Sequence, residues 1–197
     1  MPNANRPMGL APVRMITGAP YNGAANIYSI AAAYATALYI GDPVISSGTA
    51  DTRGVAGVIL AAATGPIRGV IVGLGSSPSL LANPGNLDAT FRPGASQATV
   101  WYALVVDDPN VVFEVQEIGT GTALTATEVG LNTNLVIGTG NGFVSGWLLD
   151  NASEGTAATL QVRLLGLRVR ADNEFGAFAK WNVMINAHEL RVGSAGL

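Results

Sequence analysis

Short apolar segments separated by glycine-rich turns fill the chain from residue 41 onwards. The chain contains 25 glycines in 197 residues, about 13% against a usual share of about 7%. These glycines supply turns and bulges roughly every eight to twelve residues, a spacing that suits short strands better than helices. The spacing of the glycine-rich turns therefore predicts an all-β fold, built as a jelly-roll-like sandwich or barrel.

Nine segments between these turns are rich in β-branched and aromatic residues, as strands are. Residues 24–40 are ambiguous, because they carry apolar residues at helical spacing and also two strand-like stretches, and we expect two strands there. In residues 180–186 the larger apolar side chains alternate with the others, which indicates a strand with one buried face. The nine expected strands are 39–46, 57–62, 67–73, 99–106, 111–118, 134–137, 143–149, 159–169 and 180–186.

Two turns are expected to close β-hairpins. Residues 107–110 read Asp-Asp-Pro-Asn between two β-branched runs, with proline and asparagine where a tight turn favours them. Residues 138–142 read Gly-Thr-Gly-Asn-Gly, a composition that tolerates positive φ. Residues 76–84 are expected to form a long loop of the kind that often contacts partners.

The first 23 residues predict an extended N-terminal arm, followed by a single β-rich domain at residues 24–197. Prolines at four positions of the arm exclude regular helix and favour extended backbone. The arm carries too many apolar side chains for a solvated tail, so we expect it to lie on its own domain or on a neighbouring subunit. Its candidate contacts with a neighbouring subunit or other partner protein are Met8, Leu10, Val13, Arg14, Met15 and Ile16.

The composition favours a member of a larger assembly. Hydrophobic residues make up 49% of the chain and charged residues 12%, roughly half the usual charged share of a soluble domain. A soluble monomer normally carries more charge to resist association. The ten basic residues are spread thinly along a chain of net charge −3, which argues against direct binding of nucleic acid.

The sequence predicts neither a disulfide framework nor a membrane span. There are no cysteines, so burial and hydrogen bonding must hold the fold together. The longest uncharged stretch, residues 15–41, is broken by polar residues, glycine and proline, whereas a bilayer span needs roughly 20 mostly apolar residues. The first 20 residues lack the apolar run of a signal peptide, so we expect a protein made and used in a cytoplasm.

No set of residues has the pattern of a catalytic or cofactor site. His188 is the only histidine and is expected at the surface or at a strand end, which leaves a nucleophilic triad without its usual base. Glu114 and Glu117, three apart on an expected strand, should face opposite sides and so cannot easily flank one bond. We therefore expect no enzyme activity and no cofactor.

Metal and phosphate sites are not expected either. Asp107 and Asp108 are interpreted as turn residues, because the segment lacks the regularly spaced ligands of a calcium loop. Residues 73–77 resemble a phosphate loop superficially, with no lysine after them. Arg168 and Arg170 share strand parity and fit an intersubunit salt bridge better than a nucleic-acid groove.

Several stretches taken together resemble virion structural proteins of tailed bacteriophages, of the head decoration or cement type. This resemblance implies a subunit that binds the outer surface of the shell, often as a homotrimer, and bridges neighbouring major capsid proteins. It also implies a location on the capsid surface of the virion, after assembly in the cytoplasm of a bacterial host. The matching stretches are IGDPV (40–44), PIRGVIVG (66–73), DDPNVVFEVQE (107–117), SGWLLD (145–150), LLGL (164–167) and DNEFGAFAKW (172–181).

Other functions fit the same composition. A tail or head-to-tail connection protein would also be β-rich and poor in charge. A carbohydrate-binding β-sandwich would stack Trp101, Tyr102 or Trp147 on sugar rings, although core packing is the alternative use of these aromatic residues. A hydrolase is the third alternative.

Overall fold

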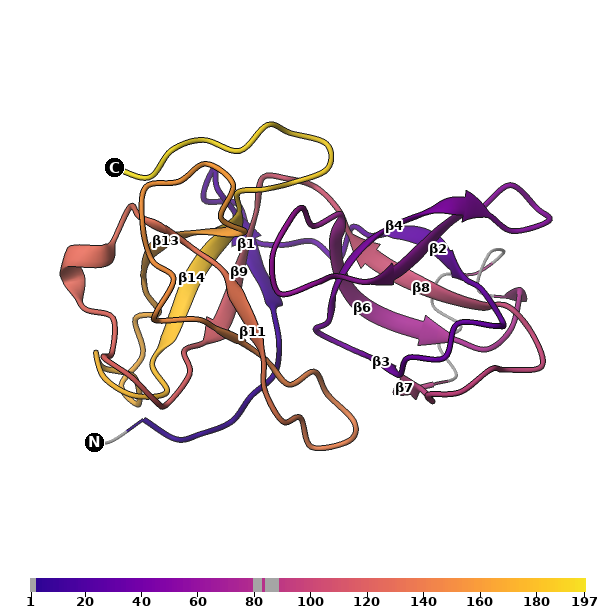
Figure 1. Ribbon diagram of the computed structural model, residues 1–197, viewed down its shortest axis with the longest axis horizontal. Helices are drawn as coiled ribbons and strands as arrows, with labels where there is room; N and C mark the ends of the chain where they lie inside the picture. The colour runs from indigo at the N-terminus through magenta and orange to yellow at the C-terminus, as the bar shows by residue number, and fades with distance from the viewer. Residues whose placement is uncertain (1–2, 80–82, 84–88) are drawn as a thin grey trace.

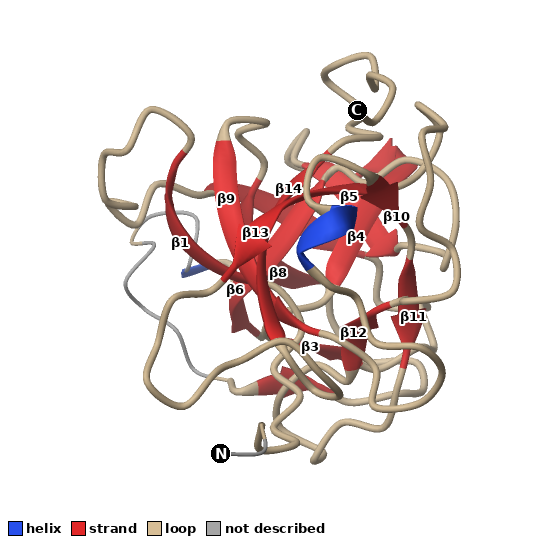
Figure 2. Cartoon of the chain, turned by 90° about the vertical axis from the view of Figure 1, so that its left-hand side faces the viewer, coloured by secondary structure: helices blue, strands red, loops and turns tan. Residues whose placement is uncertain are grey.

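The computed structural model describes residues 3–79, 83 and 89–197, which form two β lobes joined along a seam (Figure 1). Both ends of the described chain lie on the same lobe, at the left of Figure 1. Seen from that side, strands joined by long loops make up most of the molecule, with a short helix in front of them (Figure 2). The predicted all-β fold is confirmed, and it contains a closed barrel.

The barrel lobe is a closed five-stranded barrel with the strand order β2-β5-β4-β6-β8. Its pairs are antiparallel except β2 with β5, which are parallel and joined at Ser29 and Gly57. A two-stranded sheet of β3 and β7 is added to it. The strands are β2 (Asn26–Ile30), β3 (Leu38–Tyr39), β4 (Pro43–Ala50), β5 (Ala56–Leu60), β6 (Gly69–Gly75), β7 (Phe91–Arg92) and β8 (Trp101–Val106).

The sheet lobe contains a five-stranded antiparallel sheet with the order β1-β9-β14-β13-β10 and a β11-β12 hairpin. In β14, Trp181, Val183 and Ile185 are buried while Asn182 and Met184 are half-buried, which confirms the predicted alternation. The elements are β1 (Ala11–Met15), β9 (Val111–Gln116), the 3-10 helix η1 (Ala126–Glu128), β10 (Asn132–Thr133), β11 (Leu135–Ile137), β12 (Trp147–Leu149), β13 (Val162–Leu167) and β14 (Lys180–Ile185).

Each of the nine expected segments contains or overlaps a strand, and residues 24–40 form two strands as predicted. The short strands β7 and β10 were not predicted, because two residues are too few to show a periodicity. The expected loop at residues 76–84 lies partly outside the described residues. In the part of the chain that the structure describes, no helix is long and apolar enough to cross a membrane.

The turn at residues 107–110 does not close a hairpin, so that prediction was wrong. The turn itself forms, with Val111 N–H donating to the Asp108 carbonyl over 3.1 Å. However, β8 pairs with β2 and β6 in the barrel, whereas β9 pairs with β1 and β14 in the sheet lobe. Asp107, just after β8, hydrogen-bonds to Asn26 and Tyr28 of β2, which holds the end of β8 in the barrel while the chain passes on to the sheet lobe.

The turn at residues 138–142 does close the predicted hairpin. β11 and β12 pair in antiparallel register, with Ile137 opposite Trp147. The connection is longer than expected and spans residues 138–146, hereafter the glycine loop.

The N-terminal arm lies on its own chain, one of the two placements expected for it. β1 pairs with β9, with Ala11 opposite Glu114 and Met15 opposite Val111. Ahead of β1, the Asn3 amide exchanges hydrogen bonds with the backbone of Glu174 over 2.8 and 3.0 Å. The arm therefore supplies an edge strand to the sheet lobe.

Three segments that are distant in sequence meet at the seam between the lobes. Leu10 N–H donates to the Gly41 carbonyl over 3.0 Å, and Ser145 N–H donates to the Ile40 carbonyl over 3.0 Å. A Cβ atom on Gly9 would lie within 3.0 Å of the Gly41 carbonyl oxygen and of the Ser145 side chain. The arm, the β3–β4 turn and the glycine loop therefore approach more closely than any side chain at residue 9 would permit.

We expect Gly9→Ala to lower the free energy of unfolding by about 3 kcal/mol, because the added methyl group overpacks the seam at a residue with φ of +65°. Gly18→Ala is the matched control, because Gly18 has φ of +94° and a Cβ atom added there would meet nothing within 4 Å. It should cost only about 1 kcal/mol of backbone strain. Urea unfolding measures both, and equal losses would contradict the close approach at the seam.

Candidate functional site

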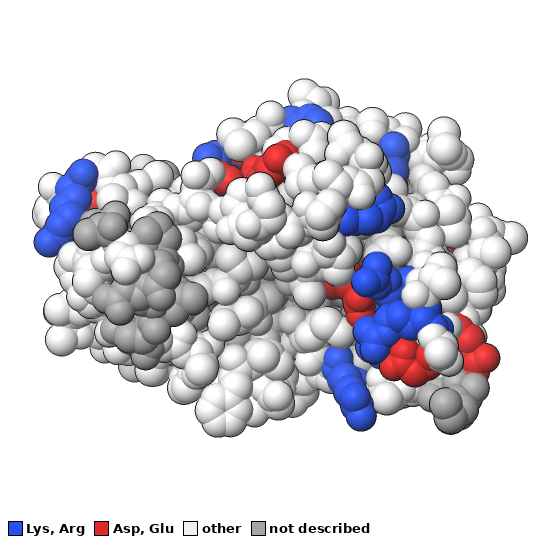
Figure 3. Space-filling model, turned by 180° about the vertical axis from the view of Figure 1, so that it is seen from behind, with Lys and Arg blue, Asp and Glu red and all other residues white. Residues whose placement is uncertain are grey.

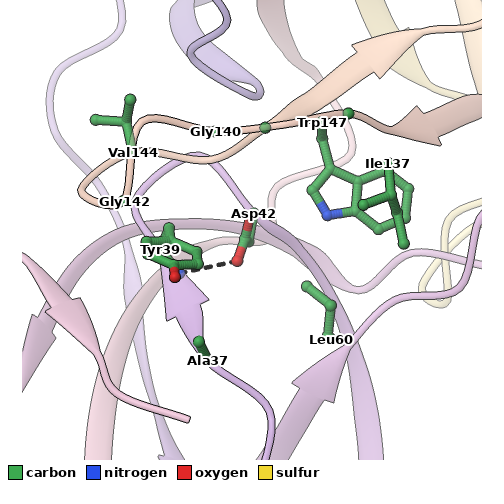
Figure 4. Close-up of a pocket in the computed structure, with 11 residues that line it drawn as sticks. Ala37, Tyr39, Asp42, Leu60, Ile137, Gly140, Gly142, Val144 and Trp147 are labelled. Carbon is green, nitrogen blue, oxygen red and sulfur yellow. Dashed lines mark hydrogen bonds between the residues drawn. The ribbon is translucent and has the colours of Figure 1, made fainter.

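A cavity of about 290 Å³ opens at the seam, and we call it the seam cavity (Figure 4). Its barrel side is formed by Ala37, Tyr39, Asp42 and Leu60. Its other side is formed by the glycine loop with the flanking Ile137 and Trp147. Both lobes therefore contribute to one site, which exists only while they are docked.

The glycine loop is folded tightly on itself. Gly138 N–H donates to the Gly146 carbonyl over 2.9 Å, and a Cβ atom on Gly146 would lie within 3.0 Å of Gly138 and Gly140 backbone atoms. The Asn141 side-chain oxygen accepts the N–H groups of Phe143 and Val144 over 3.0 and 2.9 Å. These contacts fix the loop tip, so the loop presents its side chains from a defined backbone.

Asp42 is a buried carboxylate in the wall of the seam cavity. Its side chain accepts Tyr39 N–H over 2.8 Å and also hydrogen-bonds to the Ser145 side chain in the glycine loop. The residue is 2% exposed, and no ion pair formed by the described residues includes it. Burial raises the pKa of Asp42 from 3.8 to about 6, because the charged form loses its hydration.

Beside the cavity lie four residues that we call the aromatic patch: Tyr39, Phe91 and Phe143, whose rings contact one another, and Ile137, which lines the cavity together with Tyr39. The Tyr39 and Phe91 rings stack with centroids 5.6 Å apart, and Phe91 meets the edge of Phe143 at 6.1 Å. Phe143 is 61% exposed and Ile137 is 59% exposed. Large apolar side chains gathered at the surface of a structured loop are typical of protein interaction sites.

Charged side chains gather elsewhere, and Figure 3 shows one such group on the sheet lobe beside a large uncharged surface. Glu114 lies 3.1 Å from Arg168 and 3.2 Å from Arg170, and Arg170 also pairs with Asp172 at 2.9 Å. The two arginines thus form ion pairs within their own chain, and the expected intersubunit salt bridge stays a prediction. The pairing of β9 with β14 brings Glu114 to them, a contact that strand parity does not reveal.

Glu114 and Glu117 occupy separate environments, as expected. Glu117 is fully buried and accepts hydrogen bonds from the Trp181 indole over 3.0 Å, the Asn151 amide over 3.0 Å and Leu124 N–H over 2.9 Å. Burial raises the pKa of Glu117. These donors make the carboxylate a structural centre of the sheet lobe.

Asp107 and His188 differ from their predicted surroundings. Asp108 is a turn residue as expected, but Asp107 accepts the Tyr28 hydroxyl over 2.5 Å and the Asn26 amide over 2.8 Å, tying the end of β8 to β2. His188 follows β14, which confirms a strand end, but it is 4% exposed rather than at the surface. Its Nδ1 accepts Leu190 N–H over 3.0 Å, and burial lowers its pKa.

The aromatic residues considered for sugar stacking belong to the interior. Trp101 is 9% exposed, Tyr102 is fully buried and Trp147 is 2% exposed. Their use in the core is therefore confirmed, and none of them offers an open ring face for a sugar.

The six predicted contact residues of the arm differ in how far they are buried. Leu10 is 1% exposed and belongs to the core of the sheet lobe, so it is corrected from a contact residue to a core residue. Met15 packs against the same core. Met8, Val13 and Arg14 are half-buried, and Ile16 is 42% exposed.

Within residues 3–79, 83 and 89–197 no group of three or more His, Asp or Glu side chains could hold a metal ion. A scan against protein-family models found no match, and searches of curated proteins and of solved structures found no similar protein.

Sequence reasoning missed the seam cavity and the aromatic patch. The available signal was an aspartate inside the apolar run IGDPV and a phenylalanine after the glycine-rich turn. Neither indicates a site until the two lobes are docked.

We expect Asp42→Asn to change the pH dependence of stability. Because the pKa of Asp42 is raised in the folded state, its stabilising contribution is complete below about pH 4 and is lost as the pH rises through about 6. Between pH 4 and pH 8 the wild type should therefore lose about 2–3 kcal/mol relative to the variant. Urea unfolding at both pH values measures this difference.

Glu154→Gln is the control, because it removes a carboxylate at an exposed position of the sheet lobe. It should leave the pH dependence of the wild type unchanged. A wild type and Asp42→Asn variant with parallel pH profiles would contradict the burial of a chargeable Asp42.

Proposed function

We propose that this protein is a structural subunit of a tailed-bacteriophage particle, of the head decoration or cement type. In this role it binds the outer surface of the shell, bridges and stabilises major capsid protein subunits, and carries out no catalysis. The observation that carries the proposal is the aromatic patch, which the glycine loop holds exposed beside the seam cavity. The resemblance of the sequence to such proteins supplies the class of partner.

The energetics of an apolar patch suit a repeated contact on a shell. Burying apolar surface contributes about 25 cal/mol per Å², offset by the cost of association and side-chain ordering. A patch of four large side chains gives a modest affinity by itself. Self-association as a homotrimer would let several such contacts form at once, which raises the overall binding strength, and a shell offers many symmetric sites for them.

The arm takes a smaller part in this proposal than its sequence indicates. Leu10 is in the core and β1 is paired within its own sheet. Among the predicted contact residues, Ile16 remains exposed enough to reach a partner. We therefore propose the aromatic patch as the main contact, with the outer side of the arm as a second one.

The experiment that tests the proposal measures the mass of the purified protein and its copy number on particles that carry it. A stable trimer in roughly hundreds of copies per particle supports shell decoration, whereas about six or twelve copies indicate a connector or tail component. A monomer absent from every particle would overturn the assembly role.

We expect Phe143→Ser to weaken association with the shell by at least about tenfold, because it removes the most exposed ring of the patch. Val169→Ser is the matched control, since Val169 is 92% exposed and lies outside the patch. Co-sedimentation with particles depleted of the protein measures both variants. Equal binding by the two would exclude the patch as the contact.

A further inference from the structure

The seam cavity contains a carboxylate that lacks a cationic partner. Asp42 receives hydrogen bonds from Tyr39 N–H and the Ser145 side chain, and a carboxylate can accept about four. Buried carboxylates are normally paired with a cation or bound to a metal. Within the part of the chain that the structure describes, Asp42 has no such partner. The cavity is therefore already formed, but the carboxylate in its wall is not neutralised by a cation from this part of the chain.

The walls of the cavity suit an organic cation. Tyr39 lines the cavity beside Asp42 (Figure 4), and its half-buried ring is the aromatic surface that a cation in the cavity could contact. Aromatic rings attract ammonium and guanidinium groups through their electron-rich faces. Leu60 and Ile137 add apolar surface that would cover the methylene groups of a long basic side chain.

We propose that the seam cavity binds the ammonium or guanidinium group of a lysine or arginine side chain presented by the docked partner protein. The identity of the partner rests on the proposed function, whereas the binding of a cationic group rests on the cavity itself. The cavity lies beside the aromatic patch and shares Tyr39 and Ile137 with it. A partner that covers the patch therefore places its side chains over the cavity opening.

Other ligand classes fit the site less well. An anion would meet the carboxylate of Asp42, and Tyr39 is the other titratable residue that lines the cavity, so no lining residue supplies a positive charge. A calcium ion needs six to eight oxygen ligands, and one carboxylate supplies at most two. A volume of about 290 Å³ lies at the lower end of the range for small-molecule sites and matches one side chain.

The test uses the free protein and two small probes, n-butylammonium chloride and n-butylguanidinium chloride, with 1-butanol as the neutral control. Chemical-shift titration at pH 8 should show saturable binding of at least one cation with a dissociation constant of about millimolar. The shifts should centre on Tyr39, the Trp147 indole and the glycine loop. The neutral alcohol should bind at least about tenfold more weakly.

Asp42→Asn keeps the shape of the side chain and should weaken cation binding by at least about tenfold. A second comparison does not depend on the variant folding: in the wild type, binding should weaken similarly at pH 4.5, where Asp42 is protonated. Absence of binding at pH 8, or binding that Asp42→Asn and low pH leave unchanged, would overturn the proposal.

The outcome is separable from that of the proposed function, because the titration contains no particle. If the protein were absent from every particle, cation binding would still be measured and the class of partner would be the part in error. If Phe143→Ser abolished shell association while the free protein bound no cation, the result would support docking through the aromatic patch and overturn the cation site.

Discussion

The close approach of backbone at Gly9, Gly41 and Ser145 is the constraint on which the rest of the molecule depends. Two hydrogen bonds join the arm and the glycine loop to the β3–β4 turn, and no side chain fits at residue 9. The chain starts in the sheet lobe, builds the barrel and returns at residue 107. Docking at the seam converts two small β lobes into one body with a shared surface.

The same seam places a carboxylate where burial penalises its charge. Asp42 binds Ser145 across the seam, so the group that suffers the penalty also links the lobes. A buried carboxylate is tolerated because hydrogen bonds offset part of its desolvation, and a cation would offset more. In the proposed complex, a cationic side chain of the docked partner pairs with the Asp42 carboxylate, which has no such partner among the described residues of the free protein.

The sequence predicted the local features of the fold well. Turn residues and β-branched runs located the strands, and the period of two in β14 identified its buried face. The hairpin at the glycine loop was also found, because glycine and asparagine at consecutive positions restrict the turn chemistry.

Long-range pairing could not be predicted in the same way. The runs on either side of residues 107–110 look alike, and the local sequence does not show that β8 pairs with β2 and β6 while β9 pairs with β1 and β14. The intrachain pairing of Arg168 and Arg170 with Glu114 depends on strand order, which one sequence does not encode locally. The candidate site was missed for the same reason, since its two walls come from segments far apart in the chain.

Amide hydrogen exchange of the protein, free and bound to the particle that carries it, tests docking at the seam. We expect residues 138–146 and the β3–β4 turn near Tyr39 and Asp42 to become strongly protected on binding, while the far side of the sheet lobe around η1 does not. Unchanged exchange in the glycine loop, with protection confined to other surfaces, would exclude docking at the seam.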